Sequence, residues 1–430
     1  MNILIQGGRV IDPATQLDTV ADVALSHGRI LSVGNVPADF APDQTVDASG
    51  CIVAPGLVDL CVRLREPGHE HEGMLSSELA AAVAGGVTSV VCPPDTEPVL
   101  DEAGLVEMLR YRAERLHQAR VFPQGALTRG LAGEVLTEMA ALTDAGCVAF
   151  GQAEVPLVNT QVTQRALQYA STFGYSVWLR PQDFYLGKGV AASGPLATRM
   201  GLAGVPVAAE TIALHTIFEL VRATGARVHL CRISSAAGVE LVRQAKAEGL
   251  SVSCDVSINS LHLIDVDLGY FDSRMRLNPP LRQQRDRDAL RAGLADGTID
   301  VLVSDHTPVD EDAKVLPFAE SEPGATGLEL LLSLSLKWAD EHQIGVSRAL
   351  AVLTCQPAAV LGSGLGTLAS SLGRLVPGGV ADLCIFDPTA TWTVNPASLR
   401  SQGKHTPFSG YELPGRVRAT VVAGQVAYSA

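Results

Sequence analysis

The segment RVHLCRISSAAGVELVRQAKAEGLSVSCDV (227–256) contains the pattern that decides the fold expected for this chain. Its two short apolar runs, 227–233 and 250–256, have the length and composition of buried strands. Between them, residues 236–249 carry apolar side chains at helical spacing and end on glycine, which is favoured just after a helix. A strand, a helix and a second strand in this order predict a right-handed crossover between parallel strands.

The same alternation extends in both directions along the chain. Further helical stretches at 75–86 and 286–297 also end on glycine. The strand-like runs are GLVDLCVRL (56–64), VTSVVC (87–92), VFPQGAL (121–127), CVAFG (147–151), YSVWLR (175–180), RVHLCRI (227–233), LSVSCDV (250–256) and TIDVLVSD (298–305). Eight such runs with helices between them predict an α/β fold, a (β/α)8 TIM barrel.

The two ends of the chain have a different texture. Short runs of alternating apolar and polar residues, bounded by Gly, Asp or Pro, fill residues 1–55 and return in 372–430. We expect these two segments to form one small β-rich domain beside a barrel of residues 56–371. The segments 185–207 and 306–325 are long and rich in Gly and Pro, and in a barrel such loops border the mouth of the site.

Composition excludes several classes of function. With 47% hydrophobic and 18% charged residues, the chain of 430 residues has an ordinary globular balance. A net charge of −14 argues against nucleic-acid binding and against docking on an anionic membrane. Eight cysteines without a CxxC pair predict reduced thiols and a cytoplasmic location. We also expect no leader peptide and no apolar run near the ~20 residues of a transmembrane helix.

At PGLVDLCVRLREPG (55–68) the chain resembles the dihydroorotases, cyclic amidohydrolases of pyrimidine synthesis. The resemblance runs nearly end to end. Further landmarks, in chain order, are GGVTSVVCPPDTEPV (85–99), LNPPLRQQRDRDAL (277–290), DGTIDVLVSDHTP (296–308) and GRLVPGGVADLCIFDP (373–388). It implies the barrel and a composite small domain built from both termini.

The positions that the resemblance assigns to metal ligands have changed here. Active members carry His-x-His on the first strand, an acid after strand 4, and histidines at the ends of strands 5 and 6. The residues at these positions are Cys61 and Arg63, Gln152 and Ala153, Arg180, and Arg232. Only the acid of strand 8 is retained, as Asp305. A catalytic zinc needs about three protein ligands, so we expect the zinc site to be lost, with no metal and no catalytic residues.

The substrate-side positions are mixed. Arg65 and Asn278 match family residues that contact the substrate, whereas Asp95 stands where the family has an asparagine. We expect Asp95 to oppose an anionic substrate, because it replaces an amide that donates hydrogen bonds.

The pattern most closely resembles the non-catalytic dihydroorotase-like chains that assemble with aspartate transcarbamoylase in some bacteria. The resemblance implies a pseudoenzyme that serves as a structural or regulatory subunit in pyrimidine biosynthesis. Its expected partner is the aspartate transcarbamoylase catalytic chain, in a hetero-oligomer and with a homodimer of its own. Two alternatives stay open: a dihydroorotase-type cyclic amidohydrolase with an atypical or reduced metal site, and a sensor that binds an anion without turnover.

The three arginines suggest an electrostatic replacement for the lost metals. If Arg63, Arg180 and Arg232 point inward, their permanent charges could pair with Asp305 in the vacated space. The alternative is that some of them extend outward to solvent at the mouth.

Several other residues have chemistry without a clear role. His69 and His71 form a pair after strand 1, for which a solvated loop is the expectation. Cys231 and Cys254 are expected to pack into the core, Cys231 on the face opposite Arg232. His306 is expected to be a hydrogen-bonded structural histidine; to His229 we assign no role.

Overall fold

The computed structural model describes residues 1–430 and contains the expected barrel. Its parallel strands follow chain order around the ring. They are β6 (Leu57–Asp59), β7 (Val87–Cys92), β8 (Arg120–Ala126), β9 (Ala149–Gly151), β10 (Ser176–Leu179), β13 (Arg227–Leu230), β14 (Val252–Ser257) and β15 (Val301–Val303). A parallel bridge between Val62 and His306 joins the first strand to the last beyond their regular parts. The prediction of a (β/α)8 fold is therefore confirmed.

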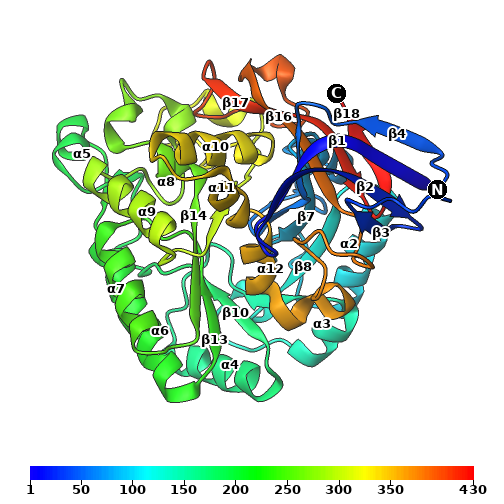
Figure 1. The fold of residues 1–430 in the computed structure, drawn as a ribbon. Helices are drawn as coiled ribbons and strands as arrows, with labels where there is room; N and C mark the ends of the chain where they lie inside the picture. Colours follow the sequence, from blue (N-terminus) through cyan, green and yellow to red (C-terminus); the bar gives the residue numbers. More distant parts are fainter.

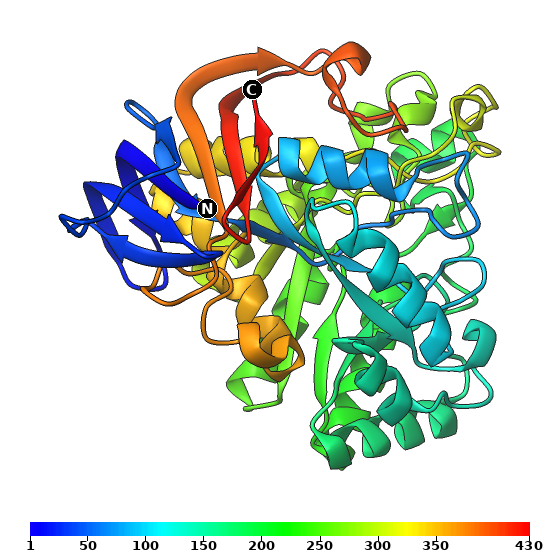
Figure 2. The ribbon, with the colours of Figure 1, turned by 90° about the vertical axis from the view of Figure 1, so that its right-hand side faces the viewer.

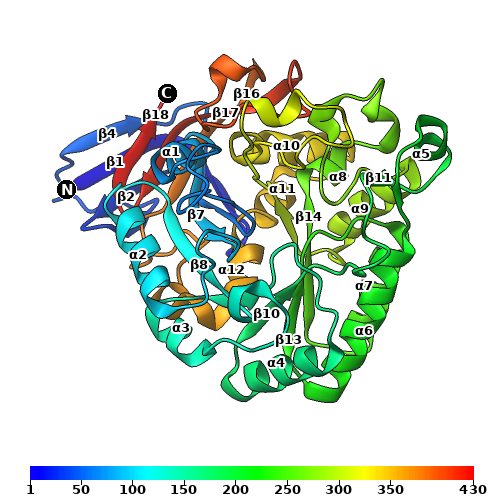
Figure 3. The ribbon, with the colours of Figure 1, turned by 180° about the vertical axis from the view of Figure 1, so that it is seen from behind.

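Helices surround the barrel strands. Figure 3 shows helices on both sides of β8, β10 and β13. The helices are α1 (Leu75–Ala84), α2 (Ala103–Glu114), α3 (Met139–Ala145), α4 (Thr160–Phe173), α5 (Pro195–Met200), α6 (Ala208–Thr224), α7 (Ala236–Ala247), α8 (Ile258–His262), α9 (Gln284–Asp296), α10 (Leu331–Glu341), α11 (Val346–Ala351) and α12 (Cys355–Leu361). The long loop after β10 adds a two-stranded ribbon, β11 (Ala191–Ala192) with β12 (Gly204–Val205).

The helix ends show why the local sequence forms these elements. Helix α7 begins after Ser235, whose side chain accepts a hydrogen bond from the amide of Gly238. Helix α9 ends at Gly297, which has a left-handed φ of 86°. Gly249, which follows α7, has a φ of 82°. Glycine adopts this conformation without steric cost, so the predicted helix ends at 249 and 297 are confirmed.

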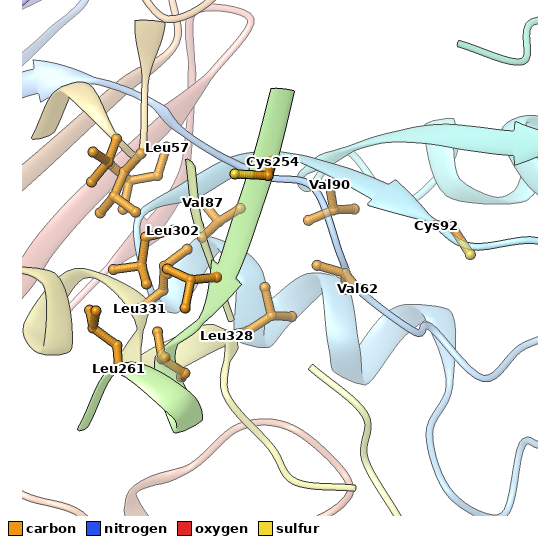
Figure 4. Close-up of a cluster of buried hydrophobic side chains, with 14 of the residues drawn as sticks. Leu57, Val62, Val87, Val90, Cys92, Cys254, Leu261, Leu302, Leu328 and Leu331 are labelled. Atoms are coloured by element: carbon orange, nitrogen blue, oxygen red, sulfur yellow. The ribbon is translucent and has the colours of Figure 1, made fainter. Parts of the chain in front are cut away.

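The largest hydrophobic core lies between the strands and the helices that cover them. Figure 4 shows part of it, where Leu57, Val87 and Leu302 from strands approach Leu328 and Leu331. All five side chains are fully buried. Burying side chains of this size contributes about 1.5–3 kcal/mol each, which favours the closed ring of strands.

The small β-rich domain is a second sheet beside the barrel, and both chain termini lie on it (Figures 1 and 2). Its strands are β1 (Asn2–Asp12), β2 (Leu17–Ser26), β3 (Arg29–Val33), β4 (Gln44–Asp47), β5 (Ile52–Pro55), β16 (Leu383–Thr393), β17 (Glu412–Val422) and β18 (Gln425–Ser429). The N-terminal and C-terminal parts meet where β5 pairs antiparallel with β16. Only Gly56 separates β5 from β6, and a Cβ there would lie 2.2 Å from Oγ1 of Thr88.

One apolar stretch, Val346–Leu368, is long enough to cross a bilayer by length and composition, contrary to the expectation of no such run. It is not one continuous helix, because α11, α12 and a 3-10 segment, Gly362–Leu368, divide it. More than half of its most apolar window, 56%, is buried within the protein. Buried core helices pass the same composition test, so the stretch is weak evidence for a membrane segment.

Candidate functional site

The residues singled out in the sequence lie at the carboxyl ends of the barrel strands. Cys61, Arg63 and Arg65 follow β6, Arg180 follows β10, and Arg232 follows β13. The others lie in the same way: Asp95 after β7, Ala153 after β9, Asn278 after β14 and Asp305 after β15. This end of a TIM barrel is where active sites are built, so the candidate site is the barrel mouth.

Glu154, which the sequence reasoning did not select, is the centre of the mouth. Its carboxylate accepts hydrogen bonds from Arg63 Nη2 at 3.0 Å and from Asn278 Nδ2 at 2.8 Å. It also forms ion pairs with Arg180 and Arg232. Three guanidinium groups from three strand ends therefore converge on one carboxylate, which follows a fourth strand.

The electrostatics of Glu154 follow from this arrangement. Burial by itself would raise the pKa of Glu154, but the attraction of Arg180, Arg232 and Arg63 outweighs burial and holds the pKa far below its ordinary value. The side chains of these three arginines are 4–7% exposed, so the inward orientation holds for all three. None of them extends to solvent at the mouth.

Asp305 has a smaller part in the network than expected. Only Arg232 pairs with it, at 3.1 Å from Nη1 to Oδ1, while Arg63 and Arg180 pair with Glu154 instead. The expectation that all three arginines pair with Asp305 is therefore wrong for two of them. Burial raises the pKa of Asp305, and Arg232 only partly opposes that effect.

The charge of Asp95 is also paired within the network. Its Oδ2 accepts a hydrogen bond from Arg63 Nε at 2.8 Å, and Nη1 of the same arginine donates to Thr307 Oγ1 at 3.0 Å. Asp95 thus orients Arg63, which in turn reaches Glu154. The pairing with Arg63 offsets the charge with which we expect Asp95 to oppose an anionic substrate.

The resemblance placed Gln152 and Ala153 at the position of the acid that follows strand 4 in active members. Neither side chain reaches the centre of the mouth. Gln152 accepts from the amide and hydroxyl of Thr128 and donates to the carbonyl of Leu131. Ala153 has a left-handed φ of 49°, which turns the chain so that the next side chain enters the mouth. The signal for Glu154 was present as an acid one residue further along, in AFGQAEVP.

Strand alternation also fails at Arg232, because this residue, like Ala153, has a left-handed backbone conformation. β13 ends at Leu230, and Arg232 has a left-handed φ of 56°, so the period of two no longer applies. Cys231 is therefore not on the opposite face from the mouth. It packs against the hydrophobic cluster that includes Cys61 and Trp178, within the field of Asp255 and Arg232. Cys254 behaves as expected and lies fully buried in the main core.

Arg65 and Asn278, the expected substrate contacts, are both engaged by the protein itself. Arg65 Nε donates to the carbonyl of Pro308 at 2.8 Å and lies 2.7 Å from Glu72 Oε2. Asn278 accepts from Arg180 at 2.6 Å and donates to Glu154. Neither side chain points unpaired into the mouth.

Beneath the mouth, polar groups fill part of the barrel interior. His229 is fully buried, with Nε2 2.9 Å from Asp255 Oδ2 and Nδ1 2.8 Å from Ser253 Oγ. Ligand atoms of His229, Cys231 and Asp255 lie within 4.8 Å of one another. His229, to which the sequence reasoning assigned no role, is thus part of a buried polar cluster.

His306 is a structural histidine, as expected. Its Nδ1 accepts from the amides of Gly327 and Leu328, and Nε2 lies 2.7 Å from Glu78 Oε2. Both ring nitrogens of His306 therefore have hydrogen-bond partners within the protein, and the side chain is fully buried.

A pH dependence is expected from Asp59, which is fully buried at the base of the mouth. Burial raises its pKa to about 7, and its Oδ2 has no hydrogen-bond partner. Because the folded pKa exceeds the unfolded value of about 3.9, the wild-type protein should lose stability as pH rises from about 4 to about 7, by up to about 4 kcal/mol. Asp59→Asn should remove this loss. Urea unfolding at pH 5 and pH 8 checks it: a stability difference between variant and wild type that does not grow with pH contradicts the prediction.

The residues present do not fit the metal centre that the resemblance implies. Arg63, Arg180 and Arg232 bring fixed positive charge to positions that a divalent cation would need. Cys61, 3.6 Å from Asp305 through its sulfur, is buried, and burial raises its pKa well above its ordinary value. A protonated thiol is a poor metal ligand. Asp305 alone, already paired with Arg232, does not make a site.

The mouth contains a cavity of about 520 Å³ with an unusually polar wall. Only two of its sixteen lining residues are hydrophobic, whereas ligand pockets are mostly apolar. Five carboxylates line it against two guanidinium groups: Glu72, Asp95, Glu154, Asp305 and Glu322 against Arg63 and Arg65. Asp95, Glu154 and Asp305 are paired with Arg63 and Arg232, and Glu72 lies beside Arg65, so most of the charge on this wall is balanced within the protein.

Comparison with known proteins agrees with the fold. Residues 201–427 match the model of the Amidohydrolase family, and residues 50–237 match the model described as Dihydro-orotase-like. Among solved structures, L-hydantoinase (dihydropyrimidinase) from Arthrobacter aurescens superposes with a TM-score of 0.88. The alignment covers 99% of this chain and 96% of that chain, at 24% identity, which shows the fold alone. The fold and its mouth thus define a barrel of the amidohydrolase class.

Full-length relatives narrow the class. "Dihydroorotase-like protein" from Pseudomonas aeruginosa is 44% identical over 429 residues, covering 100% of both chains. "Dihydroorotase" from Citrifermentans bemidjiense is 40% identical over 433 residues, again covering 100% of both. The chain therefore belongs to the dihydroorotase-like family of the amidohydrolase superfamily.

Proposed function

We propose that this chain is a dihydroorotase-like pseudoenzyme. In this proposal it is a structural or regulatory subunit that assembles with the aspartate transcarbamoylase catalytic chain in pyrimidine biosynthesis, in the cytoplasm. The observation that carries the loss of activity is the cluster of Arg63, Arg180 and Arg232 on Glu154, at the strand ends where active relatives hold metal. The partner, the hetero-oligomer and the homodimer rest on the resemblance alone.

In this proposal the mouth lacks both an activated water nucleophile and a group that polarises the substrate carbonyl. Hydrolysis of an unactivated cyclic amide needs water activated to near neutral pKa and a polarised carbonyl, both of which metal supplies in this class. The arginines could polarise a carbonyl, but the charge of each is already paired with Glu154, Asp95 or Asp305. Since the carboxylate of Glu154 is held ionised by three cations, it is also too weak a base to activate water.

The alternative is a cyclic amidohydrolase with an atypical or reduced metal site. Two observations favour it: relatives named Dihydroorotase match along the whole chain, and His229, Cys231 and Asp255 bring three possible ligand atoms together inside the barrel. The third reading, an anion sensor, is disfavoured by the carboxylate-rich wall of the cavity.

The deciding experiment measures turnover and assembly on the full chain. We expect no hydrolysis of dihydroorotate and no cyclisation of carbamoyl aspartate, with or without added zinc. We also expect co-elution with the aspartate transcarbamoylase catalytic chain from size-exclusion chromatography. Zinc-dependent turnover that Cys231→Ser abolishes would establish the alternative. Absence of both turnover and co-elution would overturn the scaffold role while leaving the loss of hydrolysis standing.

A further inference from the structure

The loop after β6 brings two imidazoles and a carboxylate to the rim of the mouth. Ligand atoms of His69, His71 and Glu72 all lie within 4.8 Å of one another, and His71 Nε2 is 3.9 Å from Glu72 Oε1. The expectation of a solvated histidine pair missed Glu72 as a third group. In a tetrahedral zinc site, ligand atoms lie about 3.3 Å apart, so closure requires a contraction of up to about 1.5 Å. His71, 61% exposed, is free to make that movement.

The backbone of this loop is already held in place. The amide of Glu72 donates to the carbonyl of His69 at 2.9 Å, and the amide of His69 donates to the carbonyl of Arg65 at 2.8 Å. From the far side, Gln402 Nε2 lies 2.9 Å from the carbonyls of both Glu70 and His71. The three side chains therefore lie on a turn that hydrogen bonds hold in place, which lowers the conformational entropy lost when a ligand binds.

Glu72 is oriented as a metal-binding carboxylate is in proteins. Its side chain is 7% exposed; Oε2 lies 2.7 Å from Arg65 Nε as an ion pair without a hydrogen bond, and Oε1 lies 3.9 Å from His71 Nε2. Ligating carboxylates are themselves held by such partners. The carboxylates of Glu72 and Glu322 line the same cavity. A cation would relieve this crowding of carboxylates.

We propose that His69, His71 and Glu72 form a binding site for a divalent transition-metal ion, of which Zn²⁺ is the best match. Two imidazoles and one carboxylate are a ligand set typical of zinc. The ion would bind at the rim, above the arginine and glutamate network, beside a cavity wall with excess carboxylates. The site is separate from the lost family centre and does not depend on the proposed function.

The test is isothermal titration of the full chain with ZnCl₂ alone. We expect about one equivalent bound, at least about tenfold weaker binding in Glu72→Gln, and no measurable binding in the double variant His69→Ala with His71→Ala. Glu70→Gln and His215→Asn are matched controls, since Glu70 caps the amide of Gly68 and His215 is an exposed histidine on α6. Both controls should bind zinc as the wild type does.

A second measurement locates the ion. In crystals soaked with zinc, an anomalous peak within bonding distance of His69 and His71 is expected. The inference is overturned if the wild type binds no zinc or if the double histidine variant binds it unchanged. Loss of binding in Cys231→Ser would also overturn it, because the ion would then belong to the inner cluster. Zinc at the rim without turnover leaves the proposed pseudoenzyme intact.

Discussion

Replacing Glu154 with alanine is expected to lower the free energy of unfolding by about 3 kcal/mol, because three buried guanidinium groups lose their shared counter-charge. Breaking a buried pair costs about 3–5 kcal/mol, and Glu154 belongs at the lower end because its side chain is 29% exposed. Urea or thermal unfolding measures the loss. Glu219→Ala, which removes a carboxylate that is 75% exposed and pairs with Arg222, should stay within about 0.5 kcal/mol.

The same variant should acquire affinity for small carboxylates. Truncation leaves Arg63, Arg180, Arg232 and Asn278 around a space of carboxylate size, so formate or acetate should restore part of the lost stability. Chloride at equal ionic strength is the control, since it lacks the paired oxygens that guanidinium groups bind. An unchanged unfolding midpoint in Glu154→Ala, or equal effects of formate and chloride, contradicts the assignment of Glu154 as the centre of the network.

The pH dependence of this effect has a definite sign. The folded pKa of Glu154 lies below its unfolded value of about 4.3, so its stabilisation is present above that pH and is lost as pH falls. The difference between wild type and Glu154→Ala should therefore shrink below about pH 4.

Arg232→Met is expected to cost about 3–5 kcal/mol, because Asp305 is left as a buried carboxylate without its partner. Methionine keeps the length of the aliphatic stem, so the loss reports mainly charge and hydrogen bonds. Asp305→Ala should cost less, about 1–3 kcal/mol, since Arg232 still pairs with Glu154.

A double-mutant cycle separates the pair from its surroundings. In the combined variant the two losses should not add, and the coupling should amount to about 0.5–3 kcal/mol. Additive losses would mean that Arg232 and Asp305 do not stabilise one another. If Asp305→Ala leaves both stability and assembly unchanged, the hypothesis that the arginines and Asp305 together substitute for metal is wrong.

The fold could be predicted from the sequence because its signals are local. Eight apolar runs became the eight barrel strands, and the glycines at 249 and 297 ended helices as expected. The positions that differ from the ligand pattern implied by the resemblance could be identified from the sequence. Their interactions could not, since left-handed residues such as Ala153 and Arg232 follow the strand ends and break the alternation that sequence reasoning relies on.

The sequence by itself determined the barrel, the β-rich composition of both ends and the presence of three arginines at positions that the family resemblance assigns to metal ligands. Only the tertiary structure decided that these arginines converge on Glu154, that Asp95 is paired, and that Glu72 joins the rim histidines. Helix and strand patterns are set by burial at short spacing along the chain. The partners of a buried charge come from strand ends far apart in sequence, and three-dimensional closure of the barrel selects them because an unpaired buried charge is costly.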